Sequence, residues 1–166
     1  MIKKFNKFVK ESLTAEDMLY NSETRKILLD AFGEEDFKSI YIFLAETKNY
    51  KKDTYYHVNC NLGEAGVGQG LYLGRDKQAL INFYDIEEQG FSVDTYVGKP
   101  KWLNLMDYDK YRKFEKDAIK KYGNLNHNNQ IKLLTLEKGY SGIRYFDILC
   151  TGEEFVLFDI SKLRKI

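Results

Sequence analysis

The stretch GQGLYLGRDKQALINFY, residues 68–84, carries the local signals on which our fold prediction rests. Two glycines flank a short apolar run, which predicts a buried strand. Asp76 then stands at the N-cap position of a helix over KQALINFY. A strand, a tight turn and a helix packed this closely fit a structural scaffold. They also fit a pocket with Tyr72 as its floor and Phe83 or Tyr84 as its wall.

The segments on either side of this stretch predict an α+β domain. Residues 2–32 have helical character, whereas KSIYIFLAE (38–46) fits either a strand or a buried helix. Helices are predicted over 107–122 and 128–139, each followed or ended by a glycine. Strands are predicted for TYYHVNC (54–60), FSVDTYVG (91–98), WLNLMD (102–107, or an extended helix entry), GIRYFDIL (142–149) and EFVLFDI (154–160). The last two strands flank the turn CTGE and therefore predict a hairpin.

Composition indicates one globular domain and gives no electrostatic signal for nucleic acid. The 166 residues are 43% hydrophobic and 15% aromatic, which is enough to build a core. The 26 basic and 25 acidic residues leave a net charge of +1, whereas a duplex-binding protein usually has a strongly basic surface. The densest basic segment, 110–122, is interrupted by Glu115 and Asp117 and predicts a solvated helix face.

The two cysteines, Cys60 and Cys150, predict free thiols in a reducing compartment. No cysteine–histidine cluster has the spacing of metal ligands, so we expect no metal. The lysine-rich start MIKKFNKFVK has no apolar segment after it, and no run is long enough to span a bilayer. We therefore expect a cytoplasmic protein without a signal peptide or a membrane partner.

Two polar residues in predicted strands are candidates for chemistry. Glu154 opens EFVLFDI, where a carboxylate either points into a cleft or, like Glu153 beside it, keeps a hairpin turn solvated. His57 lies among aromatic and β-branched residues, where it either satisfies a local hydrogen bond or binds a ligand. Cys60 follows it by three residues and points to the opposite face of an extended strand, which disfavours a Cys–His nucleophile pair.

The glycine-rich segment GEAGVGQG, residues 63–70, lacks the arrangement of either common phosphate-binding motif. It contains neither the P-loop lysine pattern nor a Gly-x-Gly-x-x-Gly that leads into a helix. We interpret it as a connection between two strands that can close over a ligand.

Taken in chain order, these features resemble the ADP-ribosyltransferase superfamily. The likeness is to its His-Tyr-Glu branch of poly(ADP-ribose) polymerases and diphtheria-type toxins. GQGLYLGRD is similar to the family's Gly-x-Gly-Ile-Tyr-Phe segment, and EEFVLFDISKLRKI is similar to its terminal Glu-Tyr-Ile-Val-Tyr-Asp strand. GYSGIRYFD resembles the passage before that strand in small phage and polyvalent-protein members. The resemblance covers residues 41–166, and 1–40 would be an N-terminal helical segment.

The resemblance implies split mixed or antiparallel sheets around an NAD+ cleft. It also implies transfer of ADP-ribose from NAD+, with release of nicotinamide. Glu154 would stabilise the oxocarbenium-like state and orient the nucleophile. A single compact domain favours transfer of one unit, and we expect a protein acceptor, with a nucleic-acid acceptor as the alternative. A bacterial or phage origin suits the Lys-, Asn- and Tyr-rich composition.

The same resemblance implies which residues would hold NAD+. Tyr72 would stack on the nicotinamide ring, and Phe83 or Tyr84 would close the other side. His57 would hydrogen-bond the adenosine ribose, and the backbone of Val58 would pair with the carboxamide. Together with Glu154, His57 and Tyr72 form the implied catalytic set.

The chain departs from the family pattern near His57 and Glu154. Val58 and Asn59 follow the histidine, where the family has Gly and then Ser or Thr, and fifteen positions separate His57 from Tyr72. Gly152 stands two residues before Glu154, which argues against the arginine-specific Glu-x-Glu branch. Two alternatives therefore stay open: a catalytically inactive NAD+- or ADP-ribose-binding module, and an RNA 2′-phosphotransferase. The balanced charge and the lack of an evident arginine-lined phosphate site argue against the latter.

Overall fold

A computed structural model describes residues 22–47, 50–59, 70–84, 86–147 and 152–166, and its fold is α+β, which confirms the predicted class. The helices are α3 (Ser22–Phe32), α4 (Glu34–Thr47), α5 (Lys77–Phe83), α6 (Ile86–Gln89), α7 (Tyr108–Tyr122), α8 (His127–Glu137) and the short 3-10 helix η2 (Ile160–Lys162). The strands are β1 (Thr54–Asn59), β2 (Leu71–Leu73), β3 (Ser92–Gly98), β4 (Trp102–Leu105), β5 (Gly142–Asp147), β6 (Gly152–Leu157) and β7 (Leu163–Lys165).

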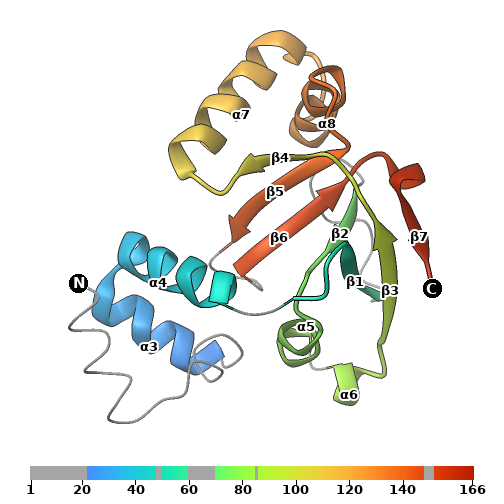
Figure 1. Cartoon of the computed structure of the whole chain (residues 1–166). Helices are drawn as coiled ribbons and strands as arrows, with labels where there is room; N and C mark the ends of the chain where they lie inside the picture. Colours follow the sequence, from blue (N-terminus) through green and yellow to red (C-terminus); the bar gives the residue numbers. More distant parts are fainter. Residues whose placement is uncertain (1–21, 48–49, 60–69, 85, 148–151) are drawn as a thin grey trace.

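The described strands form two sheets that lie against each other (Figure 1). The first is antiparallel in the order β1-β3-β7, and the second has the order β2-β6-β5-β4. The second sheet is mixed, because β4 runs parallel to β5 while β2, β6 and β5 are antiparallel. An isolated bridge between Tyr56 and Gly74 joins β1 to the residue that follows β2, and the ladder between β1 and β2 does not extend beyond it.

The local signals around β2 are confirmed by the structure. Asp76 caps α5, since its carboxylate accepts hydrogen bonds from the backbone of Gln78 and Ala79, each at 3.1 Å. The predicted C-terminal hairpin is the antiparallel pair β5–β6, in which Tyr145 lies opposite Glu154. Gly152 and Glu153, which we assigned to the turn CTGE, are strand residues paired with Asp147 and Phe146, so that part of the turn prediction was wrong. Residues 148–151 lie outside the described residues.

The ambiguous segment 38–46 is helical and belongs to α4. Phe37, Ile40 and Tyr41 are buried at the i, i+3, i+4 spacing of one helix face, which decides between helix and strand. The predicted boundary between the N-terminal segment 1–40 and the domain 41–166 therefore falls inside α4. Of the predicted helix over 2–32, the described part is α3, which is followed by Gly33 with a φ of +77°.

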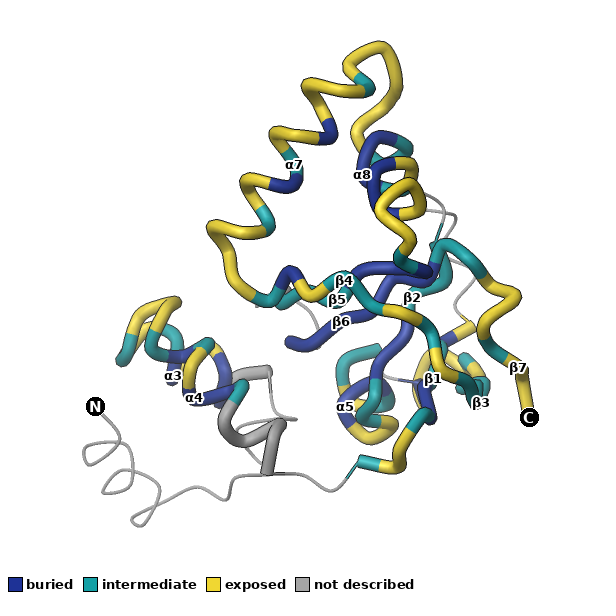
Figure 2. Tube along the Cα trace, turned by 45° about the horizontal axis from the view of Figure 1, so that its top comes forward, coloured by how far each residue is buried: buried dark blue, intermediate teal, exposed yellow. Residues whose placement is uncertain are grey.

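Strand β6 is the centre of the core and is buried on both faces (Figure 2). Phe155 and Leu157 pack with Tyr55 of β1 on the face toward the first sheet. Val156 points the other way, into a cluster with Ile143 and buried residues of α7 and α8. Because neighbouring strand residues alternate in direction, the two glutamates at the start of β6 also face opposite sides.

The surfaces of the helices agree with the charge pattern. The lysines and arginines within 110–122 are exposed along α7, as predicted for a solvated face. None of the helices in the described ranges combines the length and apolar character that crossing a bilayer requires.

Candidate active site

The site begins where β1 and β2 part. Tyr56 and Gly74 exchange two backbone hydrogen bonds, with N···O distances of 2.8 and 2.9 Å. In a continuous antiparallel ladder, the next exchanging pair would be Val58 and Tyr72. The structure gives the carbonyl of Tyr72 a different partner, because His57 Nδ1 lies 2.7 Å from it. The side chain of His57 thus ties the two strands together where the ladder stops.

This contact fixes the chemistry of the His57 ring. A carbonyl oxygen can only accept, so Nδ1 carries the proton and donates to Tyr72. In the neutral ring, Nε2 is then a hydrogen-bond acceptor, to which a ribose hydroxyl can donate. The ring is half-buried and lies edge-on to Tyr96 of β3, with the centroids 6.5 Å apart.

The backbone of Val58 points toward β2, at the position where the pairing of β1 with β2 has stopped. Its backbone groups point to the same side as those of Tyr56, because strand residues two apart share a direction. Tyr56 faces Gly74 of β2, so the N–H and C=O of Val58 face the side on which the strands separate. Its side chain is buried in a cluster with Leu80 of α5 and Ile86 of α6. The whole residue is only 5% exposed, and its contact with a carboxamide stays a prediction.

Tyr72 and Glu154 share one face of the second sheet. Tyr72 pairs with Val156, and Glu154 stands two residues earlier on β6, so both side chains project to the side of Val156. Glu154 is only 7% exposed, and its Oε2 accepts a hydrogen bond of 2.7 Å from the hydroxyl of Tyr145. The ring of Tyr111 in α7 packs against Tyr145, 6.0 Å between centroids. Sequence reasoning missed Tyr145, whose role depends on the hairpin register.

The rings predicted to form a clamp lie on two different elements. Tyr72 is half-buried and borders the cluster that β5 and β6 form with α7 and α8. Phe83 ends α5, and its ring meets Tyr84 edge-on with 4.9 Å between centroids. Tyr84 borders a different cluster, that of Val58, Leu80 and Ile86. The stacking of nicotinamide between these rings remains a prediction.

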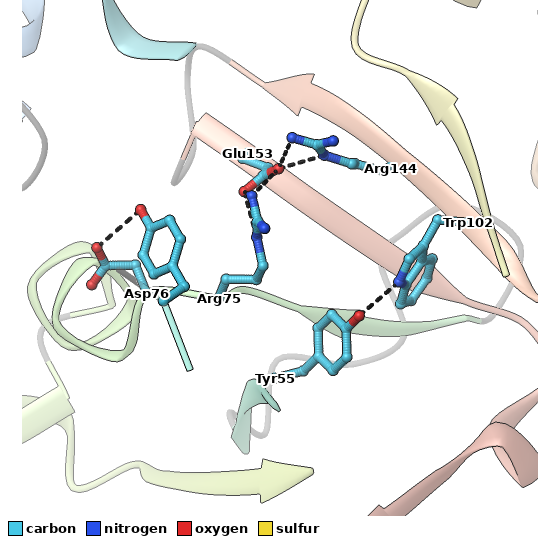
Figure 3. A network of polar contacts seen from close by, with 7 residues as sticks. Tyr55, Arg75, Asp76, Trp102, Arg144 and Glu153 are labelled. Atoms are coloured by element: carbon cyan, nitrogen blue, oxygen red, sulfur yellow. Dashed lines mark hydrogen bonds and ion pairs between the residues drawn. The ribbon is translucent and has the colours of Figure 1, made fainter. Parts of the chain in front are cut away.

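Glu153 has an environment that the sequence interpretation got wrong. It is not a solvated turn charge, since only 8% of it is exposed. Arg75 donates to its two oxygens at 2.7–3.0 Å, and Arg144 pairs with it from β5 (Figure 3). Arg75 also lies over the ring of Tyr50, whose hydroxyl donates to Asp76 at 3.4 Å. A strand that is buried on one face only would have exposed either Glu153 or Glu154. Because β6 is buried on both faces, neither glutamate is exposed.

These arginines also bear on the RNA 2′-phosphotransferase alternative. Arg75 and Arg144 converge in space, which the sequence did not reveal, but both guanidiniums are bound to Glu153. A phosphate would have to displace a buried carboxylate to bind between them. This pair therefore does not form the open phosphate site that the alternative needs.

The cavity beside this cluster is small and polar. It has a volume of about 10 Å³, room for roughly one water molecule. Tyr41, Tyr50, Asp76 and Glu153 contribute to its lining. Within the described ranges, the structure contains no group of three or more His, Cys, Asp or Glu side chains suited to a metal ion. Cys60, Cys150 and most of the loop 63–70 lie outside these ranges.

Comparisons with known proteins leave the family open. No protein-family model and no curated protein matches the chain. A solved structure described as "Crystal structure of an anti-CRISPR protein" aligns with 72% of this chain and 100% of its own, at 12% identity and a TM-score of 0.40. At that TM-score the likeness identifies neither a fold family nor a function.

Proposed function

We propose that this protein is a mono-ADP-ribosyltransferase of the His-Tyr-Glu type, with NAD+ as the donor. The observation that carries the proposal is the parting of β1 and β2 at a point where His57 holds the backbone of Tyr72. Val58 turns its backbone to the same gap, and Glu154 shares the sheet face of Tyr72. These residues come from three strands, and they are the ones that the resemblance singled out.

The reaction follows from the chemistry of NAD+. The bond between ribose C1′ and the nicotinamide nitrogen breaks, and its electron pair leaves with nicotinamide. Positive charge then develops on the ribose, and the carboxylate of Glu154 stabilises it and accepts a hydrogen bond from a ribose hydroxyl. The acceptor nucleophile bonds to C1′ and loses its proton, so ADP-ribosyl acceptor, nicotinamide and one proton are formed.

The binding residues divide the donor between them. Tyr72 and one ring of the Phe83–Tyr84 pair would stack on nicotinamide, and the backbone of Val58 would pair with its carboxamide. His57 would accept from an adenosine ribose hydroxyl through Nε2 while Nδ1 stays on the Tyr72 carbonyl. The acceptor is expected to be a protein, with a nucleic acid as the alternative.

The test is nicotinamide release and label transfer by the wild type and by Glu154→Gln. The protein is incubated with labelled NAD+ and cell lysate, and the modified species is identified by mass spectrometry. We expect a labelled product with the wild type and none with Glu154→Gln, whose fold is checked by circular dichroism. Full transfer by a well-folded Glu154→Gln protein would refute the assignment.

A catalytically inactive binding module is the second candidate, and the burial of Glu154 favours it. Because Glu154 is only 7% exposed, the residues that cover it would have to move before its carboxylate could contact a ribose. This module would bind NAD+ or ADP-ribose in calorimetry without releasing nicotinamide. The same incubation therefore separates the two functions.

A further inference from the structure

The edge of β6 at Glu153 is completed by a helix and not by a strand. Gly74 bonds to β1, so Leu73 directs its backbone to β6 and exchanges hydrogen bonds with Phe155. Glu153 stands two residues before Phe155 and directs its N–H to the same edge. Because β2 ends at Leu73, no residue of β2 pairs with it there. The hydroxyl of Tyr41 in α4 accepts this N–H instead.

Tyr41 also closes over the first residue of β6. Gly152 has a φ of +91°, and a Cβ at this position would lie 2.3 Å from Cζ of Tyr41. The tyrosine ring packs edge-on against Phe146 of β5, 5.2 Å between centroids. Burial raises the pKa of Tyr41 to about 12, so its hydroxyl is neutral and can serve as a hydrogen-bond partner at physiological pH. Helix α4 is therefore joined to the hairpin immediately before Glu154.

The side chain of Glu153 is fixed as firmly as its backbone. Arg75 reaches it from the turn after β2, and Arg144 from the neighbouring strand β5. Both guanidiniums also lie over the ring of Phe155, 5.5 and 5.9 Å from its centroid. The residue before Glu154 is thus held from three directions: by β5, by the turn after β2 and by α4.

We propose that Glu153 is a positioning residue for Glu154, and that Tyr41 makes α4 part of the catalytic unit. This inference rests on the proposed function. The two glutamates share a peptide unit, so a rotation of β6 that releases Glu153 also turns the Glu154 carboxylate away from Tyr145 and the ribose. A displacement of about 1 Å at a reacting group costs on the order of a hundredfold in rate.

The first experiment separates positioning from stability. Glu153→Gln leaves two guanidiniums without a carboxylate, and we expect its melting temperature and its kcat for nicotinamide release to fall. In Glu153→Gln/Arg144→Met the extra positive charge is removed, and the melting temperature should recover while kcat stays at least tenfold below wild type, with KM for NAD+ within about threefold. Glu87→Gln, on the exposed surface of α6, is the matched control and should resemble wild type. Recovery of both melting temperature and kcat in the double variant would overturn the inference.

The second measurement needs no turnover. In Tyr41→Phe the Glu153 N–H loses its acceptor, so its hydrogen exchange, followed by NMR, should accelerate at least tenfold while α8 amides stay unchanged. Unchanged exchange at Glu153 would show that α4 is not part of the catalytic unit.

If Glu154→Gln is inactive and Glu153→Gln has full kcat per folded molecule, this inference fails and the proposed function stands. If the wild type releases no nicotinamide, the proposed function and the catalytic role of Glu153 fail together, and the exchange result still decides the Tyr41 contact.

Discussion

Replacing Tyr41 by Phe should change how the stability of this protein depends on pH. The Tyr41 pKa is raised from 10.0 to about 12, chiefly by burial, and the residue is 5% exposed. As pH rises above 10, the unfolded chain loses this proton before the folded chain does, so the free energy of unfolding falls until pH passes 12. One pKa unit corresponds to about 1.4 kcal/mol. The ionisation of Tyr41 alone should therefore lower the free energy of unfolding by about 1.4 kcal/mol between pH 9 and pH 11, nearly all of it above pH 10.

The phenylalanine variant lacks this proton and also lacks the acceptor for the Glu153 N–H. An unsatisfied buried N–H costs about 1–3 kcal/mol, so the variant should be less stable than wild type by about that amount at neutral pH. The difference between the two proteins should then shrink by about 1.4 kcal/mol from pH 9 to pH 11. The stabilising effect of Tyr41 is thus fully present below pH 10 and is lost at alkaline pH.

The measurement is urea unfolding followed by far-UV circular dichroism at several pH values from 7 to 11. Tyr108→Phe is the matched control, because it removes the same hydroxyl from a residue that is 50% exposed on α7. Parallel stability profiles for wild type and Tyr41→Phe between pH 9 and pH 11 would refute the buried environment described for this hydroxyl.

Substitutions at Tyr72 and Gly152 test the proposed NAD+ site and the hairpin. Tyr72→Ala should weaken NAD+ binding by roughly one to two orders of magnitude through lost stacking, and Tyr72→Phe far less; calorimetry checks both. The melting temperature should also fall, since the ring borders the core, and an unchanged affinity per folded molecule would contradict the stacking role. Gly152→Ala should destabilise the fold by about 2–5 kcal/mol in urea unfolding, from the positive φ and the clash with Tyr41. Gly33→Ala is its control, because it shares a positive φ but has no atom within 4 Å, and an equal loss in both variants would exclude the clash.

The elements with strong local signals were predictable from the sequence. Asp76 before an apolar helix pattern, and two apolar strands around CTGE, specify their structure through contacts a few residues apart. The segment 38–46 was not decidable in this way, because an apolar run fits a buried strand and a buried helix equally. Its packing against the β5–β6 hairpin, through Tyr41 and Phe146, is a tertiary contact that the local pattern does not contain.

The sequence named single residues for the candidate site, whose roles stay a prediction, and it could not give the contacts that depend on register. The sequence indicated His57, Tyr72 and Glu154, and the structure ties His57 to Tyr72 and gives Tyr72 and Glu154 one sheet face. It did not indicate Tyr145 or the arginines, because their positions follow from which residues pair across β5 and β6. A shift of one residue in that pairing would exchange the faces of all of them.

The surroundings of the two glutamates bear on the proposal that Glu154, and not Glu153, stabilises a cation. Two carboxylates stand side by side at the start of a strand that is buried on both faces. Glu153 is neutralised by Arg75 and Arg144, so a positive charge developing on a ribose would gain little from it. Glu154 accepts a hydrogen bond from the phenol of Tyr145, a neutral donor that orients the carboxylate. An ionised carboxylate in a region of low dielectric acts strongly on a nearby cation, which is the role proposed for Glu154.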